Sequence, residues 1–261
     1  MADNGAAYPH VLTYRASGLK EDALVASSFV VSRCLRRSER MNHMSQEIEK
    51  MAAFFDKRAE GYEEHMRSLL DMDGFYGAVA GAFSESEERL NILDLGCGTG
   101  LEMGYLFQQM PNARITGIDL AGEMLNQLRH TYRERMDQIT LIQESYVTHP
   151  LGEARYDYAV SVQSLHHFLP GEKTAIYRKI HEALREGGVY VEGDFVVDEE
   201  DAEEYMQVYR DHMAEGNGAL YHLDIPFTLD TQIRLLTEAG FSKVEVLYHE
   251  DAAAVYKATK G

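Results

Sequence analysis

Cysteine is scarce in this sequence, with only Cys34 and Cys97 among 261 residues. A disulfide framework needs several pairs, so a disulfide-stapled secreted fold is excluded and a reducing, cytoplasmic setting is expected. Long apolar runs are absent too: none approaches the roughly 18 residues that a membrane span requires. The short apolar patch Leu24 to Val31 follows Glu21 and Asp22 rather than a basic segment, so it does not resemble a signal peptide. We therefore predict no membrane partner.

The sequence has few positive charges: it contains 25 Lys and Arg and 43 Asp and Glu, which gives a net charge of -18. A protein that holds a nucleic-acid backbone draws its affinity from cationic side chains, so a nucleic-acid partner is disfavoured. A hydrophobic content of 45% is enough for the full core of one large domain. The composition predicts an acidic globular protein and leaves its oligomeric state, including a homodimer, open.

Helical and strand periods divide the chain. Residues 1–43 show no clean period and are interpreted as an extension, outside the fold or disordered, whereas residues 44–261 are expected to form one domain. Apolar side chains recur at helical spacing from Ser45, a suitable N-cap, to about Leu70, and again over Phe75 to Phe83. These stretches predict a helical cap before the first strand.

Strands and helices then alternate, which is typical of a mostly parallel sheet with helices on both faces. The expected strands are Asn91–Leu95, Arg114–Asp119, Ile139–Glu144, Asp157–Val162, Val189–Asp194, Lys243–Tyr248 and Ala253–Ala258. The expected helices are Leu101–Met110, Ala121–Arg135, Glu172–Arg185 with a glycine stop at Leu184 to Gly188, Glu199–Glu215 and Leu229–Ala239. The short turn before the last strand predicts an antiparallel hairpin. Residues 195–228 interrupt the alternation and are interpreted as a lid insert.

The stretch Ile92 to Gly100, ILDLGCGTG, places a glycine loop directly after a buried strand. Such loops bind nucleotide-like ligands at the carboxyl ends of parallel strands. The dinucleotide spacing GxGxxG would need a glycine where Leu101 stands, and no GxxxxGK[ST] loop is present. Asp119 ends the next strand beside this loop, where its carboxylate can accept from two vicinal ribose hydroxyls.

These motifs resemble those of the class I S-adenosylmethionine (SAM)-dependent methyltransferases. ILDLGCGTG is similar to the first motif of that family and ITGIDLAGEML to the second. Tyr156 to Phe168, Leu184 to Gly188 and Glu238 to Phe241 resemble later motifs in the family's order, and the likeness runs from about Ser45 to Lys260. The resemblance implies a Rossmann-like α/β fold, SAM as the cofactor and S-adenosylhomocysteine as its product.

The resemblance also implies where the cofactor lies. It puts the glycine loop beside the amino-acid end of SAM, Asp94 near the ammonium, Asp119 on the ribose and Met124 near the adenine. Tyr62 is expected to lie over the cofactor or to be a core aromatic. The predicted cofactor-binding residues are Asp94, Gly96, Cys97, Gly98, Gly100, Asp119, Leu120, Met124, Glu144, Ser145, Tyr146, Gln163 and Tyr62. Glu144-Ser145 departs from the Gly-Asp that the family usually carries.

The acceptor side is predicted from histidines, because a general base near neutral pH favours imidazole. The family pattern favours His166 as this base, with the alternative that one of the His166–His167 pair only caps the turn. The residues expected to wall the acceptor pocket, or else to form a plain lid core, are His167, Tyr209, His212, Tyr221 and His222. A metal site with His166, His167, His212 and His222 as ligands is the alternative for this group of histidines. No HExxH or paired CxxC spacing supports it, so no metal site is predicted.

Three functions remain from the sequence. The leading hypothesis is methyl transfer from SAM to a small-molecule acceptor with an oxygen, nitrogen or sulfur nucleophile. A protein or RNA methyltransferase is the second, against which the negative charge speaks. A non-catalytic SAM-binding protein that engages a partner is the third.

Overall fold

The computed structural model describes residues 49–213 and 221–261, which lie in one compact unit, Ile48–Gly261. The expected extension over residues 1–43, the N-cap at Ser45 and the part of the insert at 214–220 lie outside the described residues. Among the helices in the described ranges, none has the length and apolar character needed to cross a membrane.

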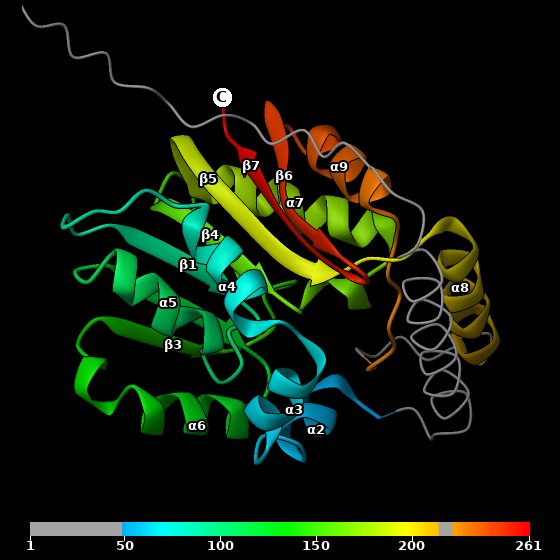
Figure 1. The fold of residues 1–261 in the computed structure, drawn as a ribbon, viewed down its shortest axis with the longest axis horizontal. Coiled ribbons are helices and arrows are strands. Elements are labelled where there is room, and N and C mark those ends of the chain that lie inside the picture. Colours follow the sequence, from blue (N-terminus) through cyan, green and yellow to red (C-terminus); the bar gives the residue numbers. More distant parts are fainter. Residues whose placement is uncertain (1–48, 214–220) are drawn as a thin grey trace, which may run out of the picture. The chain divides into compact units, whose positions relative to one another are not determined.

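The core of the unit is a seven-stranded sheet in the order β3-β2-β1-β4-β5-β7-β6 (Figure 1). Its strands are β1 (Asn91–Leu95), β2 (Arg114–Asp119), β3 (Ile139–Gln143), β4 (Tyr156–Val162), β5 (Leu184–Phe195), β6 (Lys243–Glu250) and β7 (Ala253–Thr259). The first five are parallel, and β7 runs antiparallel to both β5 and β6. The predicted sheet and its antiparallel last hairpin are confirmed. Strand order reverses between β1 and β4, which is where open parallel sheets bind ligands.

Helices cover both faces of the sheet because β1 is apolar on both sides. Side chains alternate along a strand, so Ile92 packs in one core cluster and Leu93 in the other. The Ile92 side is covered by α4 (Met72–Gly81), α5 (Leu101–Gln109) and α6 (Gly122–Thr131). The Leu93 side is covered by α7 (Pro170–Ala183) and α9 (Leu229–Glu238).

The helical cap differs from its expected form. Instead of one helical stretch, the structure has α2 (Met51–Asp56) and α3 (Tyr62–Leu69), separated by a turn. Gly61 immediately precedes α3 with φ of 85°, a left-handed conformation that only glycine adopts at little cost. The apolar period could not show this break, because it is compatible with either arrangement.

The glycine stop after α7 was also misplaced. The helix ends at Ala183 rather than Arg185, and β5 starts at Leu184 rather than Val189. The pairing with β4 moves from Tyr156↔Leu184 to Tyr158↔Val189, so Leu184 to Gly188 form a bulge in the strand. The positive φ of Gly187, 73°, therefore serves this bulge and not a helix cap.

Candidate active site

A cleft of about 610 Å³, counting its open mouth, lies at the carboxyl ends of β1, β2 and β4. Its walls come from α2, the glycine loop, the start of α6 and the segments after β3 and β4. They are Met51, Ala52, Phe55, Tyr62, Gly96, Gly98, Asp119, Leu120, Ala121, Met124, Ser145, Tyr146, Gln163, Ser164, His167 and Phe168.

The glycine loop brings backbone to the cleft. Gly96 has φ of 71°, and a Cβ there would come within 2.6 Å of Ser164 Cβ, so the loop and the segment after β4 touch without room for a side chain. Gly98 has φ of 47°, and the nearest atom to an added Cβ is Gly96 O at 3.9 Å. The loop therefore packs tightly against Ser164 at Gly96 and leaves space for a ligand beside Gly98.

Asp119 joins this loop to the second strand. Its Oδ2 accepts from the Gly98 N–H at 2.9 Å, and its Oδ1 accepts from the Ala121 N–H at 2.8 Å. Burial raises the pKa of Asp119, and these two N–H groups oppose the rise. Each oxygen still has a second lone pair. The carboxylate is thus fixed at the cleft wall with the capacity to accept from a pair of hydroxyls.

Two acids lie buried beside the glycine loop. Within the described residues, neither oxygen of Asp94 has a hydrogen-bond partner, and the same holds for Thr99 Oγ1. Burial and the neighbouring Glu102 raise the pKa of Asp94, and burial raises the pKa of Glu102 to about 7. Unpaired buried acceptors carry a large cost unless a donor reaches them. A cationic ammonium, such as that of SAM, is a donor of the required charge.

The structure brings most of the predicted cofactor residues to the cleft. Those that line it are Tyr62, Gly96, Gly98, Asp119, Leu120, Met124, Ser145, Tyr146 and Gln163. Asp94, Cys97, Gly100 and Glu144 are not among the lining residues. The Cys97 thiol packs toward Gly117 in β2, and the Glu144 carboxylate lies 2.8 Å from His149 Nδ1. Ser145 is thus the residue at the wall where the family usually has an aspartate.

The turn after β4 is held in an uncommon backbone conformation. Gln163 has φ of 49°, which is rare for a residue with a side chain, and its N–H donates to Gly193 O at 2.8 Å. Such strain persists where surrounding contacts enforce it and is frequent at functional sites. Tyr146 and Ser164 share a hydroxyl hydrogen bond of 2.8 Å beside it. The strained turn leads into the segment whose Ser164, His167 and Phe168 line the cleft.

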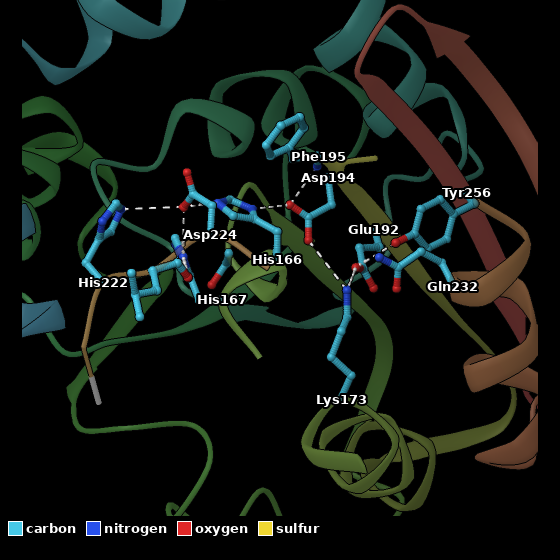
Figure 2. A network of polar contacts seen from close by, with 12 residues as sticks. His166, His167, Lys173, Glu192, Asp194, Phe195, His222, Asp224, Gln232 and Tyr256 are labelled. Atoms are coloured by element: carbon cyan, nitrogen blue, oxygen red, sulfur yellow. Dashed lines mark hydrogen bonds and ion pairs between the residues drawn. The ribbon is translucent and has the colours of Figure 1, made fainter. Parts of the chain in front are cut away.

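The two adjacent histidines have different surroundings (Figure 2). His166 Nδ1 lies 2.6 Å from Asp194 Oδ1 on β5, so it donates to that carboxylate, and its Nε2 lies 3.6 Å from Asp224 Oδ1. His167 Nδ1 lies 3.1 Å from the Leu223 carbonyl oxygen, to which it donates. The predicted base, His166, lies outside the lining set, whereas His167 forms part of the cleft wall.

Electrostatics separate the two imidazoles further. Burial opposes a proton on His166, but Asp194 and Asp224 outweigh it and raise the pKa of this histidine. Burial, followed by the charge of His166, lowers the pKa of His167. Behind them Lys173, fully buried, lies 3.2 Å from Glu192 and 3.9 Å from Asp194. His167 is thus the neutral member of the pair, backed by a buried charged network.

The remaining predicted acceptor residues divide into two groups. His222 lies near the cluster: its Nε2 is 3.8 Å from Asp224 Oδ1 and its ring stacks on Phe54. Tyr209 and His212 lie on α8 (Glu199–Met213), where His212 Nδ1 donates to Val208 O of the same helix. Tyr221 forms a single bridge with Lys50. Tyr209, His212 and Tyr221 are not among the residues that line the cleft.

Sequence reasoning missed several parts of the wall. Met51, Ala52, Phe55, Ser164 and Phe168 line the cleft, and Asp194 and Asp224 hold the histidines. Phe168 ends a stretch that resembles a family motif and Phe55 belongs to the predicted helical cap, so their apolar character was a usable signal. The two aspartates lie far from His166 in the sequence, and no local spacing indicates their contact.

Comparisons with known proteins agree with this geometry. Residues 92–188 match a family model described as a methyltransferase domain. The trans-aconitate 2-methyltransferase of Afipia carboxidovorans is 31% identical over 185 residues, which are 67% of this chain and 68% of that protein. The chain belongs to the class I SAM-dependent methyltransferases. This methyltransferase therefore uses SAM as its cofactor, and the unpaired Asp94 oxygens and the open face of Gly98 fit that group.

Other relatives of the methyltransferase are more distant. The carboxy-S-adenosyl-L-methionine synthase of Nautilia profundicola is 21% identical over 228 residues, or 81% of this chain and 93% of that one. A crystal structure of a putative O-methyltransferase from Nostoc punctiforme has a TM-score of 0.61 and 21% identity, covering 83% of this chain and 63% of its own. The structural likeness establishes the shared fold.

Proposed function

We propose that this methyltransferase transfers the methyl group of SAM to a hydroxyl group of a small, mainly apolar molecule. The observation that carries the proposal is the composition of the cleft wall. Met51, Phe55 and Phe168 supply apolar surface, His167 supplies an imidazole, and no Lys or Arg occurs among the described residues that line it. Such a wall suits a neutral acceptor that has to lose a proton.

The residues divide between two tasks. Asp94 with Glu102, and Asp119, would hold the ammonium and the ribose of SAM, which supplies an electrophilic methyl group on a sulfonium. The acceptor hydroxyl has to lose its proton as the new bond forms, and a neutral imidazole is suited to take it. His167 is the cluster member on the cleft wall, so we assign this contact to it; the role of His166 as general base stays a prediction.

Formation of S-adenosylhomocysteine tests the proposal. We would incubate the full chain with SAM and a panel of small hydroxyl-bearing, carboxylate-bearing and amine-bearing molecules, and measure the product by mass spectrometry. We expect turnover with hydroxyl-bearing apolar members and a loss of about 10²- to 10⁴-fold in His167→Gln. Calorimetry should show SAM affinity within about twofold of wild type in this variant. Turnover restricted to carboxylates or amines, or an unchanged rate in His167→Gln, would contradict the proposal.

A second candidate function follows from two relatives that cover 81% and 76% of the chain and are named carboxy-S-adenosyl-L-methionine synthases. The product named by those proteins carries a carboxylate, which a site stabilises best with Lys or Arg. The described wall residues include neither, and this favours methyl transfer. Mass spectrometry of the SAM-derived product distinguishes the two after incubation with the carboxylate-bearing molecules of the panel, which have to supply the carboxyl group. A carboxylated SAM would support synthase activity, and S-adenosylhomocysteine with a methylated acceptor would support transfer.

A further inference from the structure

The strongest unexplained feature is a buried group of ligand-type atoms beside the cleft. One nitrogen or oxygen atom from each of His166, His167 and Asp224 lies within 4.8 Å of the other two. His166 and His167 come from the turn after β4 and Asp224 from the last part of the insert, so no sequence spacing indicates their meeting. The arrangement is held together by the backbone, because Ile225 N–H donates to His166 O at 2.6 Å.

Asp224 Oδ1 lies at ion-pair distance from three imidazoles but accepts no hydrogen bond from them. Its distances to His167 Nδ1, His166 Nε2 and His222 Nε2 are 3.2, 3.6 and 3.8 Å. The nearest nitrogen already donates its proton to Leu223 O, and across the described ranges Asp224 Oδ1 has no hydrogen-bond partner. A buried carboxylate oxygen in that state is costly without a further partner.

Both histidines turn their second nitrogen toward the cluster. His166 Nδ1 donates to Asp194 and His167 Nδ1 donates to Leu223 O, so Nε2 is the nitrogen that each ring can offer to an ion. On His166 the ion has to displace a proton from Nε2. His167 is 8% exposed, and its Nε2 lacks a partner within the part of the chain that the structure describes. Metal-binding histidines nearly always donate their other N–H to a carboxylate or a backbone carbonyl, which orients the ring. The two rings show one of each arrangement.

The support behind His166 is rigid and charged (Figure 2). Asp194 Oδ2 lies 3.9 Å from Lys173 Nζ, and Lys173 lies 3.2 Å from Glu192, which accepts from Tyr256 Oη at 2.7 Å. Asp194, Lys173 and Glu192 are fully buried. A ring fixed in this way loses little freedom when it binds an ion.

We propose that His166, His167 and Asp224 form a binding site for one divalent transition-metal ion of the zinc or ferrous type. Two imidazoles and one carboxylate are the ligand set that such ions take, with positions left open for water or a substrate oxygen. Ligands of zinc at about 2.0–2.1 Å are about 3.3–3.4 Å apart in a tetrahedron. The three atoms lie within 4.8 Å of one another, so their separations need to contract by at most about 1.5 Å.

The ion would act at the acceptor end of the cleft. His167 is part of the cleft wall, so an ion beside it can be reached by an acceptor oxygen. A divalent ion makes a bound hydroxyl more acidic. With the ion on His167 Nε2, the ion replaces the free imidazole in promoting loss of the acceptor's proton, which then leaves to water. This role rests on the proposed function, whereas binding of the ion does not.

Metal binding can be measured without an acceptor. The tag-free full chain would be stripped with EDTA and titrated with Zn²⁺, Co²⁺ and Mg²⁺ by calorimetry, and the visible absorption of Co²⁺ would report nitrogen and oxygen ligands. We expect one Zn²⁺ or Co²⁺ per chain and no Mg²⁺ binding, since Mg²⁺ prefers all-oxygen sites.

Variants decide whether the ion is held by this cluster. Asp224→Asn and His167→Gln should weaken binding by more than the roughly 10–100-fold that follows from loss of an outer partner. His149→Gln is the matched control, because His149 also pairs with a carboxylate, Glu144, outside the cluster. SAM binding should be retained in all three, which shows that each is folded. Absence of binding in wild type, unchanged affinity in Asp224→Asn, or equal loss in His149→Gln would overturn the proposal.

Discussion

The two ends of the cleft are built in different ways. At the cofactor end, Gly96, Gly98 and Asp119 lie within 24 residues and act largely through backbone and one carboxylate. At the acceptor end, Phe55, His167 and Asp224 come from segments more than 50 residues apart and act through side chains. A binding site that uses backbone conformation leaves a local signature, whereas one that uses side chains from distant elements does not.

The buried charges also make the two ends respond differently to pH and to the replacement of a charged residue. The cofactor end has Asp94 and Glu102 with few cations nearby, so protonation governs its charge. The acceptor end balances its carboxylates with Lys173 and His166. Replacing single residues tests whether the cofactor end depends on its backbone conformation and its acids, and whether the acceptor end depends on its buried ion pairs.

The largest effect is expected at the support of the acceptor end. Lys173→Met removes a fully buried cation and leaves Glu192 and Asp194 unbalanced, which should lower the free energy of unfolding by about 3–5 kcal/mol. Denaturant unfolding at neutral pH measures this loss. Lys243→Met is the control: its exposed pair with Glu245 should contribute no more than about 1 kcal/mol. Equal effects in the two variants would show that the buried network does not stabilise the fold.

The next effect tests the backbone at the cofactor end. Gly96→Ala introduces a Cβ within 2.6 Å of Ser164 Cβ at a residue with positive φ. We expect a destabilisation of roughly 3 kcal/mol from steric overlap and strain, together with loss of SAM binding. Gly77→Ala is matched, since nothing lies within 4 Å of its added Cβ in α4, and it should stabilise by about 0.5–1 kcal/mol. Wild-type SAM affinity in Gly96→Ala would argue against a backbone-built site.

A smaller effect is expected for the ribose contact. Asp119→Asn keeps the size of the side chain but removes its charge and replaces one acceptor oxygen by an amide nitrogen. In the wild type the two oxygens accept from the Gly98 and Ala121 N–H groups, so the variant loses one of these hydrogen bonds. Hydrogen bonds to a charged group contribute about 1.5–3 kcal/mol, so the Kd for SAM should rise by about 10- to 100-fold. Calorimetry measures this change, and a Kd within twofold of wild type would place the ribose elsewhere.

The smallest effect is a dependence of SAM binding on pH. Burial raises the pKa of Glu102 to about 7, so this acid is largely protonated and neutral at pH 6. Ionisation as the pH rises supplies the negative charge that an ammonium needs, and SAM binding should strengthen several-fold from pH 6 to 7.5. This interval stays below the usual pKa of about 7.7–8.0 for an α-amino group. Calorimetry at these pH values should show the trend in wild type and a flatter one in Glu102→Gln; identical slopes would exclude Glu102.

Much of the fold was predictable because its elements are long and strongly patterned. Strands β1 and β2 have the predicted bounds, since β1 is a nearly continuous buried run that ends at a glycine loop and β2 is a partly buried run that ends at an acid. The predicted element boundaries were wrong where a glycine is compatible with two structures. Gly187 is compatible with a helix cap and with a strand bulge, and Gly61 divides a helix without changing the apolar period. Only pairing with β4 and packing around α2 and α3 distinguish these alternatives.

The residues of the site also divide into those that local sequence predicts and those that it does not. The glycine loop, Asp119 and Tyr62 reach the cleft as the motifs predict, whereas Tyr209, His212 and Tyr221 from the aromatic insert do not line it. Composition indicated that the insert is rich in ring side chains, but a helix presents its residues in several directions. The contact of Asp224 with His166 and His167 was invisible for a related reason, because the intervening chain leaves their separation undetermined.

By itself the sequence determined the alternation of strands and helices, the glycine loop and the acid that follows it, and hence the family and the cofactor. These features depend on backbone conformation and hydrophobic period, which neighbouring residues set. The tertiary structure alone decided which histidine reaches the cleft, which carboxylates hold the imidazoles and where their second nitrogens lie. Those contacts join distant segments, and it is the packing of the sheet, α2 and the returning segment at 221–225 that brings them within reach.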